Sequence, residues 1–179
     1  MIILPKTYRE VLHDQMIKLS KIKNSVFLGQ QVAAEDFYGT LQKIPLSKRI
    51  EMPVAEELQM SISIGLALEG FLPISIFQRM DFLLRAADSL VNHLDLIADI
   101  SDYKFDPKVI IRTTVGSTKP LDVGLQHNKN LVKGFEKLLN YVEVIDVKTP
   151  EEIEYAYEKA IETGKPIMIV EYQDLYETK

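Results

Sequence analysis

The sequence contains no cysteine. Disulfide bonds and thiolate metal sites are therefore excluded, and the absence fits a reducing compartment, so a cytoplasmic location is expected. Long apolar runs are missing as well. Residues 1–15 carry too short an apolar run for a signal peptide, and no later segment is long enough to span a membrane. We therefore expect a soluble chain with no membrane partner.

Positive charge and the common ligand-binding motifs are also scarce. The formal net charge is −5, and no basic run is interleaved with aromatic residues, which argues against a nucleic-acid surface. There is no G-x-G-x-x-G, no phosphate loop, no H-E-x-x-H pair and no G-x-S-x-G elbow. Because the three histidines are far apart in the sequence, a metal site has little support either, and none is expected.

Helical spacing and short β-branched runs alternate along the 179 residues, a length that suits one domain over 1–179. This alternation predicts an α/β fold with a mostly parallel sheet and helices on both faces. The predicted loops cover residues 30–48, with a short helical turn, and 113–126. Helices are predicted over 7–20, 54–69, 80–97, 128–139 and from Thr149 to about Gly164, and strands over 25–29, 72–77, 109–112, 142–147 and 166–171.

Several polar or aromatic residues lie near the expected ends of strands and the starts of helices. Open α/β sheets bind ligands at the carboxyl ends of their strands, which makes these residues candidates for a site. Each also has a structural interpretation. A carboxylate at Glu56, in the first turn of a helix, interacts well with the helix dipole, and on local pattern alone this interpretation is favoured. Gln78 and Asp81 fit helix caps, and Phe82 fits the core.

Two further residues are left open by the local pattern. His127 follows the long loop and precedes a helix, where a histidine suits proton transfer near neutral pH and equally suits an ordinary exposed loop. Arg112 ends a predicted strand, and its partner could be an acidic neighbour, another protein or a substrate carboxylate. His13 and His93, on a helix flank and at a helix end, are interpreted as structural.

Taken together, the motifs are more informative than any one of them. Four stretches follow one another along the chain in order and spacing: RIEMPVAEELQMSISIGLALEGFLPISIFQRMDF, VIIRTTVG, LQHNKNL and VEVIDVKTPEEIEYAYEKAI. With them, nearly the whole chain resembles the pyrimidine-binding domain of thiamine-diphosphate-dependent enzymes. It is particularly similar to the beta subunit of the decarboxylating component of 2-oxo acid dehydrogenase complexes. Pyruvate, branched-chain 2-oxo acid and acetoin dehydrogenases are members of this group. Transketolase shares this domain.

The resemblance implies a role for the candidate residues. Pro53-Val54-Ala55-Glu56 matches the family's Pro-x-x-Glu, whose glutamate hydrogen-bonds a ring nitrogen of the cofactor's pyrimidine. Phe82 matches an aromatic residue that stacks on this ring, and Gln78 matches the glutamine before it. His127 matches the active-site histidine. The resemblance thus implies Glu56 and His127 as catalytic residues, and Glu56, Gln78 and Phe82 as residues that bind thiamine diphosphate.

The chain also departs from the family. The Gly-Asp-Gly and Asn motif that binds the diphosphate and Mg²⁺ is missing, and the chain stops at Lys179 without the family's carboxyl-terminal domain. Gly29-Gln30-Gln31 replaces the family's Gly-Glu-Glu or Gly-Glu-Asp, and Asn128-Lys129 replaces the Ser-Gln after the histidine.

The resemblance therefore implies one half of a split enzyme. A separate diphosphate-binding, alpha-like subunit would hold Mg²⁺, and the assembly is expected to be a homodimer or a heterotetramer. Its substrate would be a small 2-oxo acid, which is decarboxylated and then passed to oxidative acyl transfer or to carboligation. The cofactor carries the difficult chemistry, and the protein sets orientation and protonation. The alternative is a non-catalytic scaffold or regulatory subunit whose cofactor residues are relics.

Overall fold

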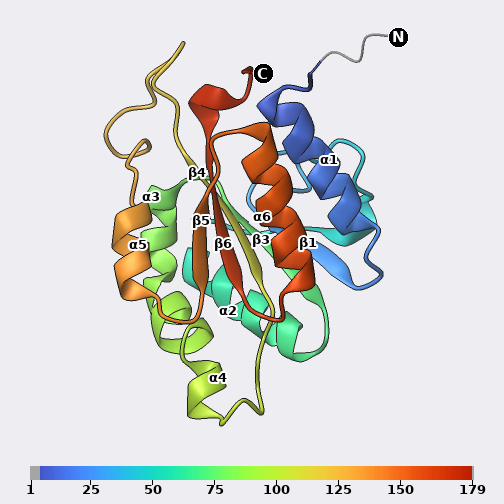
Figure 1. Cartoon of the computed structure of the whole chain (residues 1–179), viewed down its shortest axis with the longest axis vertical. Helices are drawn as coiled ribbons and strands as arrows, with labels where there is room; N and C mark the ends of the chain where they lie inside the picture. Colours follow the sequence, from blue (N-terminus) through green and yellow to red (C-terminus); the bar gives the residue numbers. More distant parts are fainter. Residues whose placement is uncertain (1–4, 179) are drawn as a thin grey trace.

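The computed structural model describes residues 5–178, and six strands within this range form one sheet in the order β2-β1-β3-β4-β6-β5 (Figure 1). Every neighbouring pair of strands is parallel. The predicted α/β fold with a mostly parallel sheet is confirmed. The prediction that residues 1–15 do not form a signal peptide rests in part on residues 1–4, which lie outside the described range. The strands are β1 Ser25–Gly29, β2 Arg49–Glu51, β3 Leu72–Phe77, β4 Ile110–Val115, β5 Glu143–Asp146 and β6 Ile167–Tyr172.

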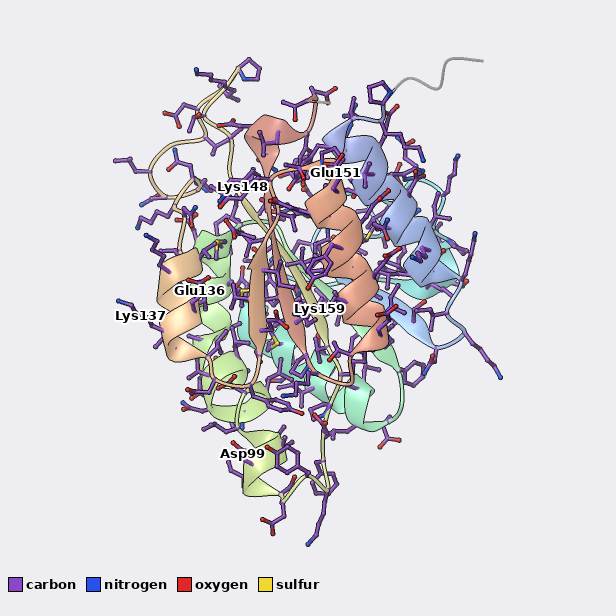
Figure 2. The ribbon with its side chains drawn as sticks, viewed as in Figure 1. Asp99, Glu136, Lys137, Lys148, Glu151 and Lys159 are labelled. Atoms are coloured by element: carbon purple, nitrogen blue, oxygen red, sulfur yellow. The ribbon has the colours of Figure 1, made fainter. Side chains whose placement is uncertain are left out.

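Helices cover both faces of this sheet. The α-helices are α1 Tyr8–Ser20, α2 Glu56–Leu68, α3 Met80–Leu83, α4 Ile97–Ile100, α5 Val132–Leu138 and α6 Pro150–Glu162. One apolar core lies between the sheet and α1 with α6, and a second lies between the sheet and α2, α5 and the segment 80–94 (Figure 1). Charged side chains such as Glu136 and Lys137 on α5 point away from the sheet (Figure 2). No helix among residues 5–178 is long and apolar enough to cross a membrane.

Two predicted helices begin as their sequences indicate. In α1 the Thr7 hydroxyl accepts the backbone N–H of Glu10, while the Glu10 carboxylate accepts the backbone N–H of Thr7. Thr149 and Glu152 form the same reciprocal cap at α6, which has proline at its first position. These caps satisfy backbone donors that helix starts leave free.

The single long helix predicted over 80–97 is wrong. The segment contains short α3, a 3₁₀ turn over Leu84–Ala86, a π-helical stretch over Ser89–Leu94 and then α4. The π stretch is followed by Asp95, whose side chain is 1% exposed. Its carboxylate accepts the backbone N–H groups of residues 140–142. A tertiary contact thus accompanies the local departure from regular helix, which periodicity alone does not reveal.

Two boundaries also differ from the prediction. The helix predicted over 128–139 begins at Val132, because Asn128 and Asn130 use their side chains elsewhere. Asn128 donates to Asp122, and the Asn130 side-chain oxygen accepts the backbone N–H of Val132. The strand predicted over 109–112 extends through Val115, so the loop that follows starts later.

The chain reverses its direction across the sheet between β1 and β3. From β1 it passes to β2 on one side and then returns to β3 on the other. Such a switch point opens a crevice at the carboxyl ends of the strands. Gly29 ends β1 here, and a Cβ on Gly29 would lie 2.3 Å from the carbonyl oxygen of Ile76 on β3. Only glycine allows these strand ends to approach so closely.

Candidate functional site

Glu56 is the first residue of α2, and its side chain points into the protein. The residue is only 3% exposed, which is unusual for a carboxylate. Its Oε1 accepts a long hydrogen bond of 3.4 Å from the Gln30 amide. Its Oε2 lies 3.0 Å from Nε of the exposed Arg85, yet it accepts no hydrogen bond from any described residue. One oxygen of this buried carboxylate therefore has a cationic neighbour but no hydrogen bond from the described residues.

The three residues predicted to bind the cofactor lie together. Glu56, Gln78 and Phe82 line one narrow pocket at the carboxyl end of β3. Gln59, one turn beyond Glu56 on α2, lines the same pocket and donates from its amide to the carbonyl oxygen of Ile76, at 3.0 Å. Sequence reasoning missed Gln59, although its position on the same helix face as Glu56 was a usable signal.

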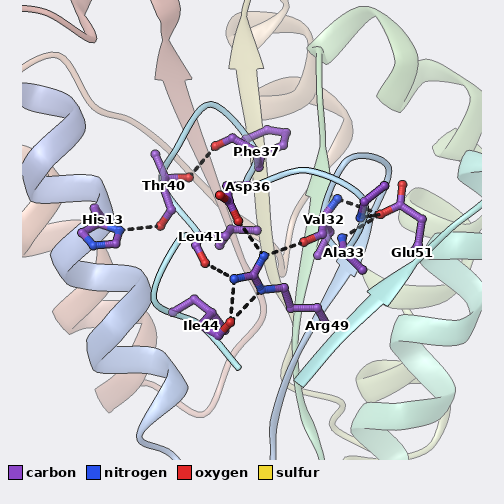
Figure 3. Close-up of polar contacts among 11 residues, drawn as sticks. His13, Val32, Ala33, Asp36, Phe37, Thr40, Leu41, Ile44, Arg49 and Glu51 are labelled. Carbon is purple, nitrogen blue, oxygen red and sulfur yellow. Dashed lines mark hydrogen bonds and ion pairs between the residues drawn. The ribbon is translucent and has the colours of Figure 1, made fainter. Parts of the chain in front are cut away.

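The loop after β1 forms another wall, and a single carboxylate on β2 organises it. Glu51 accepts four hydrogen bonds of 2.6–3.0 Å, from the consecutive backbone N–H groups of residues 31–34. Figure 3 shows the contacts with Val32 and Ala33. Burial opposes ionisation of Glu51, but these N–H groups outweigh it and hold the pKa of the carboxyl below its ordinary value. The loop then presents Gln31, whose side-chain oxygen accepts a 2.5 Å hydrogen bond from the Gln78 amide. Sequence reasoning did not find Glu51.

His127 reaches the same region from the long loop after β4. Its ring meets the half-buried ring of Phe82 edge to face, with the ring centroids 5.4 Å apart and the planes at 90°. Asp81, beside Phe82, accepts the backbone N–H of Lys129 at 3.3 Å. This contact links the start of α3 to the loop rather than capping the helix. Gly116 lies against the backbone of His127, since a Cβ there would be 2.0 Å from the His127 carbonyl oxygen.

Other residues considered from the sequence lie outside this cluster. Arg112 is 0% exposed and forms its ion pair with Glu171, so its partner is the acidic neighbour. Nδ1 of His13 lies 3.0 Å from the carbonyl oxygen of Thr40, between α1 and a loop (Figure 3). His93 lies 3.4 Å from Asp88 on its own segment. No group of three or more metal-ligating side chains occurs among residues 5–178.

The four residues singled out in the sequence, Glu56, Gln78, Phe82 and His127, thus converge at the switch point of the sheet. An acid that can accept a hydrogen bond, an aromatic platform and a histidine able to exchange protons lie within one neighbourhood. These side chains have the chemistry to contact a flat, nitrogen-containing ring and to move protons at its edge, but the pocket that three of them line is closed in this structure and must widen to admit a ring. The individual roles of these residues stay predictions.

Sequence comparison identifies distant relatives of this chain. No protein-family model matches the chain. It is 23% identical to a pyruvate dehydrogenase E1 component subunit beta from Chlorokybus atmophyticus, covering 90% of this chain and 49% of that protein. Subunits with the same name from Gracilaria tenuistipitata var. liui and Cyanidium caldarium are 27% and 25% identical, covering 73% and 100% of this chain and 39% and 54% of theirs. The chain spans about half the length of these curated relatives.

A solved structure shares the fold. It is described as a split-gene transketolase in the form of an inactive beta4 tetramer. The match has a TM-score of 0.70 and 18% sequence identity, and it covers 94% of this chain and 52% of the other. The structural match shows a shared fold, and the sequence matches show that this chain is a distant homologue of pyruvate dehydrogenase E1 beta subunits.

Proposed function

We propose that this chain is the pyrimidine-binding subunit of a split thiamine-diphosphate-dependent enzyme that acts on a small 2-oxo acid. The observation that carries the proposal is the carboxylate of Glu56. It is buried in the pocket that Gln78 and Phe82 also line, and one of its oxygens accepts no hydrogen bond from the described residues. Buried polar atoms without a partner are rare in proteins, and each calls for an explanation.

The residues present fit the cofactor's pyrimidine ring. Once Arg85 moves aside, Oε2 of Glu56 would accept a hydrogen bond from a ring N–H, and an ionised acceptor makes such a bond stronger than a neutral one does. Phe82 would support the face of the ring, and Gln78 would line its edge. When bound, thiamine diphosphate supplies the electron sink for loss of carbon dioxide from a 2-oxo acid.

His127 is the proton-transfer residue of this proposal. Its ring lies against Phe82, so a substrate carbonyl beside the pyrimidine would be within its neighbourhood. A histidine there can donate a proton to, or accept one from, an oxygen whose charge changes during reaction. Glu56 would act on the ring through charge and hydrogen bonding, whereas His127 would act on the substrate.

The proposal requires a second subunit, because this chain carries no diphosphate-binding motif. A diphosphate-binding, alpha-like subunit would hold the diphosphate and Mg²⁺ across a shared cleft. The relatives are named as beta subunits of an E1 component, which supports such a pairing. We propose a homodimer or heterotetramer of this kind in the cytoplasm. Whether acyl transfer or carboligation follows decarboxylation is a question for a screen of 2-oxo acids.

One contact favours a second function. Arg85 places its Nε 3.0 Å from Oε2 of Glu56, which gives the carboxylate a cationic neighbour from its own chain. If that neighbour is its lasting partner, Glu56 is structural, and the chain is a non-catalytic scaffold or regulatory subunit. Arg85 is 70% exposed, however, so its side chain can move aside without loss of core packing.

Glu56→Gln separates the two functions, and Glu57→Gln is its matched control, since Glu57 is an exposed carboxylate in the same helical turn. Each variant is reconstituted with the partner subunit, thiamine diphosphate and Mg²⁺, and its turnover is measured with a series of 2-oxo acids. We expect Glu56→Gln to lower kcat by roughly 10²- to 10⁴-fold with unchanged folding, and Glu57→Gln to behave as the parent. Near-normal turnover of Glu56→Gln would refute the proposal.

If the chain is a non-catalytic scaffold, the opposite result is expected. Alanine at Glu56, Phe82 or His127 would leave the partner's activity unchanged, while deletion of the whole chain would abolish assembly. Size-exclusion chromatography of the two subunits, with and without each substitution, reports assembly independently of turnover.

A further inference from the structure

Three arginine side chains are buried among residues 5–178, and two of them are fully matched to acceptors. Arg49 donates to backbone carbonyls of the loop that precedes it and to the Asp36 carboxylate (Figure 3). Arg112 presents the guanidinium edge formed by Nε and one terminal nitrogen to Glu171, with hydrogen bonds of 2.6 and 2.9 Å. Its remaining terminal nitrogen donates to Thr40. Burial of each cation is thus compensated.

Arg79 is the third, and it differs from the other two. It follows Gln78 at the carboxyl end of β3 and is 9% exposed. One terminal nitrogen makes all of its hydrogen bonds, to the Tyr38 hydroxyl and the Gln78 carbonyl at 2.8 Å and to the Thr114 hydroxyl at 3.3 Å. Its Nε is buried without a partner, and no carboxylate among residues 5–178 forms an ion pair with it.

A guanidinium cannot relieve this situation by losing its proton. A buried charge that lacks an opposite charge is strongly unfavourable. The neutral acceptors on one nitrogen, and the Tyr38 ring whose centroid lies 5.6 Å from the guanidinium carbon, compensate it only in part. The edge of Arg79 formed by Nε and the other terminal nitrogen makes no hydrogen bond with the described residues. Arg112 uses the equivalent edge of its own guanidinium to bind the Glu171 carboxylate. That fork matches the two oxygens of a carboxylate or phosphate.

The surroundings of this edge are shaped by a glycine. A Cβ on Gly116 would lie 2.9 Å from Nε of Arg79 and 2.0 Å from the carbonyl oxygen of His127. Any other residue would therefore cover the edge and displace the loop that carries His127. With glycine, Nε of Arg79 lies beside the backbone of the His127 loop, and the Val123 side chain borders the same position.

From this unpaired edge we propose that Arg79 binds a carboxylate or phosphate group of the substrate at the mouth of the site, between the end of β3 and the His127 loop. The identification of this anion as part of the substrate rests on the proposed function, whereas binding of the anion itself does not. A carboxylate and a phosphate share the same two-oxygen geometry, and the experiment separates them.

The first experiment uses the chain alone. Thermal unfolding is followed while oxamate, as the carboxylate probe, or inorganic phosphate is titrated into the protein. The variant is Arg79→Met, and its control is Arg9→Met, which removes an exposed guanidinium that pairs with Glu177 on the surface. We expect one of the two anions to raise the midpoint of the parent and of Arg9→Met, and to leave that of Arg79→Met unchanged. The anion that stabilises identifies the group.

The inference is overturned if Arg79→Met responds as the parent does, or if neither anion raises the midpoint of the parent at tens of millimolar. Should Arg79→Met fail to fold, Arg79→Lys replaces it. Lysine keeps the charge but cannot present two parallel donors, so its dissociation constant for the anion is expected to rise about tenfold or more. An unchanged constant in Arg79→Lys overturns the inference equally.

A second experiment uses the reconstituted enzyme. We expect Arg79→Lys to raise KM for an anionic 2-oxo acid by roughly 10- to 100-fold with a smaller change in kcat, because an anchoring contact is lost rather than a proton-transfer group. Glu56→Gln lowers kcat instead. If Glu56→Gln keeps full activity, the proposed function fails, while the anion titration of the chain alone still tests Arg79.

Discussion

Arg112 on β4 and Glu171 on β6 form a two-point ion pair in which both side chains are completely excluded from solvent. Hydroxyl groups surround it. Tyr157 of α6 and Tyr176 near the chain's end donate to the two carboxylate oxygens, and Thr40 accepts from the guanidinium. Burial beside the carboxylate raises the pKa of both tyrosines well above its ordinary value, so they remain donors. This network joins two strands, a helix and a loop.

The network predicts that Arg112→Met destabilises the fold severely. The substitution leaves Glu171 buried without its cation, and breaking one partner of such a pair lowers the free energy of unfolding by about 3–5 kcal/mol. The double variant Arg112→Met/Glu171→Leu should recover most of this loss, because both charges are gone. Urea denaturation of the parent, single and double variants measures the difference. A single variant within about 1 kcal/mol of the parent would contradict this account.

Glu51 predicts a separate, local effect near the site. Replacing its carboxylate by an amide in Glu51→Gln removes the charge and one of the two acceptor oxygens, so the four backbone N–H groups of residues 31–34 can no longer all be accepted as they are in the parent. We expect faster hydrogen exchange at these four amides, while the amides of β3 stay protected. Because Gln31 contacts Gln78, cofactor binding by the reconstituted enzyme should also weaken. Unchanged hydrogen exchange at residues 31–34 would show that the structure of this loop does not depend on the Glu51 carboxylate.

Much of this architecture was accessible from the sequence. The alternation of helical spacing with short β-branched runs predicted the parallel sheet, and the motifs Thr7-x-x-Glu10 and Thr149-Pro150 located two helix starts. These features are local, because a helix cap is decided by residues three positions apart. The convergence of Glu56 with Phe82 was likewise predictable, since both follow strands whose carboxyl ends meet at one edge.

What the sequence could not supply depends on contacts between distant segments. Asp95 accepts amides about 45 residues away, and the helix predicted around it is broken into short pieces. Glu51 looks like any exposed acid at the end of a strand until the loop of residues 31–34 folds onto it. Arg112 had three possible partners, and only the pairing of β4 with β6 selects Glu171. Side-chain partners across a sheet follow from register, which no local pattern encodes.

Asp174 predicts a pH dependence in the loop that carries His127. Its carboxylate accepts the backbone N–H groups of Thr118 and Lys119 and the Thr118 hydroxyl. Partial burial opposes ionisation, but these hydrogen bonds outweigh it and lower the pKa of Asp174 below its ordinary value of 3.8. A lowered pKa in the folded state means that the contact stabilises fully above the unfolded-state pKa and is lost as pH falls through the folded-state value.

We therefore expect the amide resonances of Thr118 and Lys119 to be constant at neutral pH and to shift together only below about pH 4. Asp174→Asn should abolish this titration and make the loop more mobile than in the parent at neutral pH, where the parent carboxylate is ionised. Nuclear magnetic resonance of labelled protein between pH 7 and 3 measures both. Amides that titrate near pH 6 instead would point to a histidine as the responsible group and refute the assignment to Asp174.

Gly116 gives the sharpest structural test of how the loop positions His127. In Gly116→Ala the new methyl group would lie 2.0 Å from the His127 carbonyl oxygen and 2.9 Å from Nε of Arg79, so the loop must move. Gly134→Ala is the control, because nothing lies within 4 Å of a Cβ at that position in α5. Alanine there should stabilise the protein by about 0.5–1 kcal/mol through its better helix propensity.

We expect Gly116→Ala to retain the sheet, to lose the ring contact between His127 and Phe82, and to lower turnover of the reconstituted enzyme at least tenfold. Circular dichroism, thermal unfolding and turnover of both variants decide the matter, and full activity in Gly116→Ala would mean that this loop position does not hold His127 at the site.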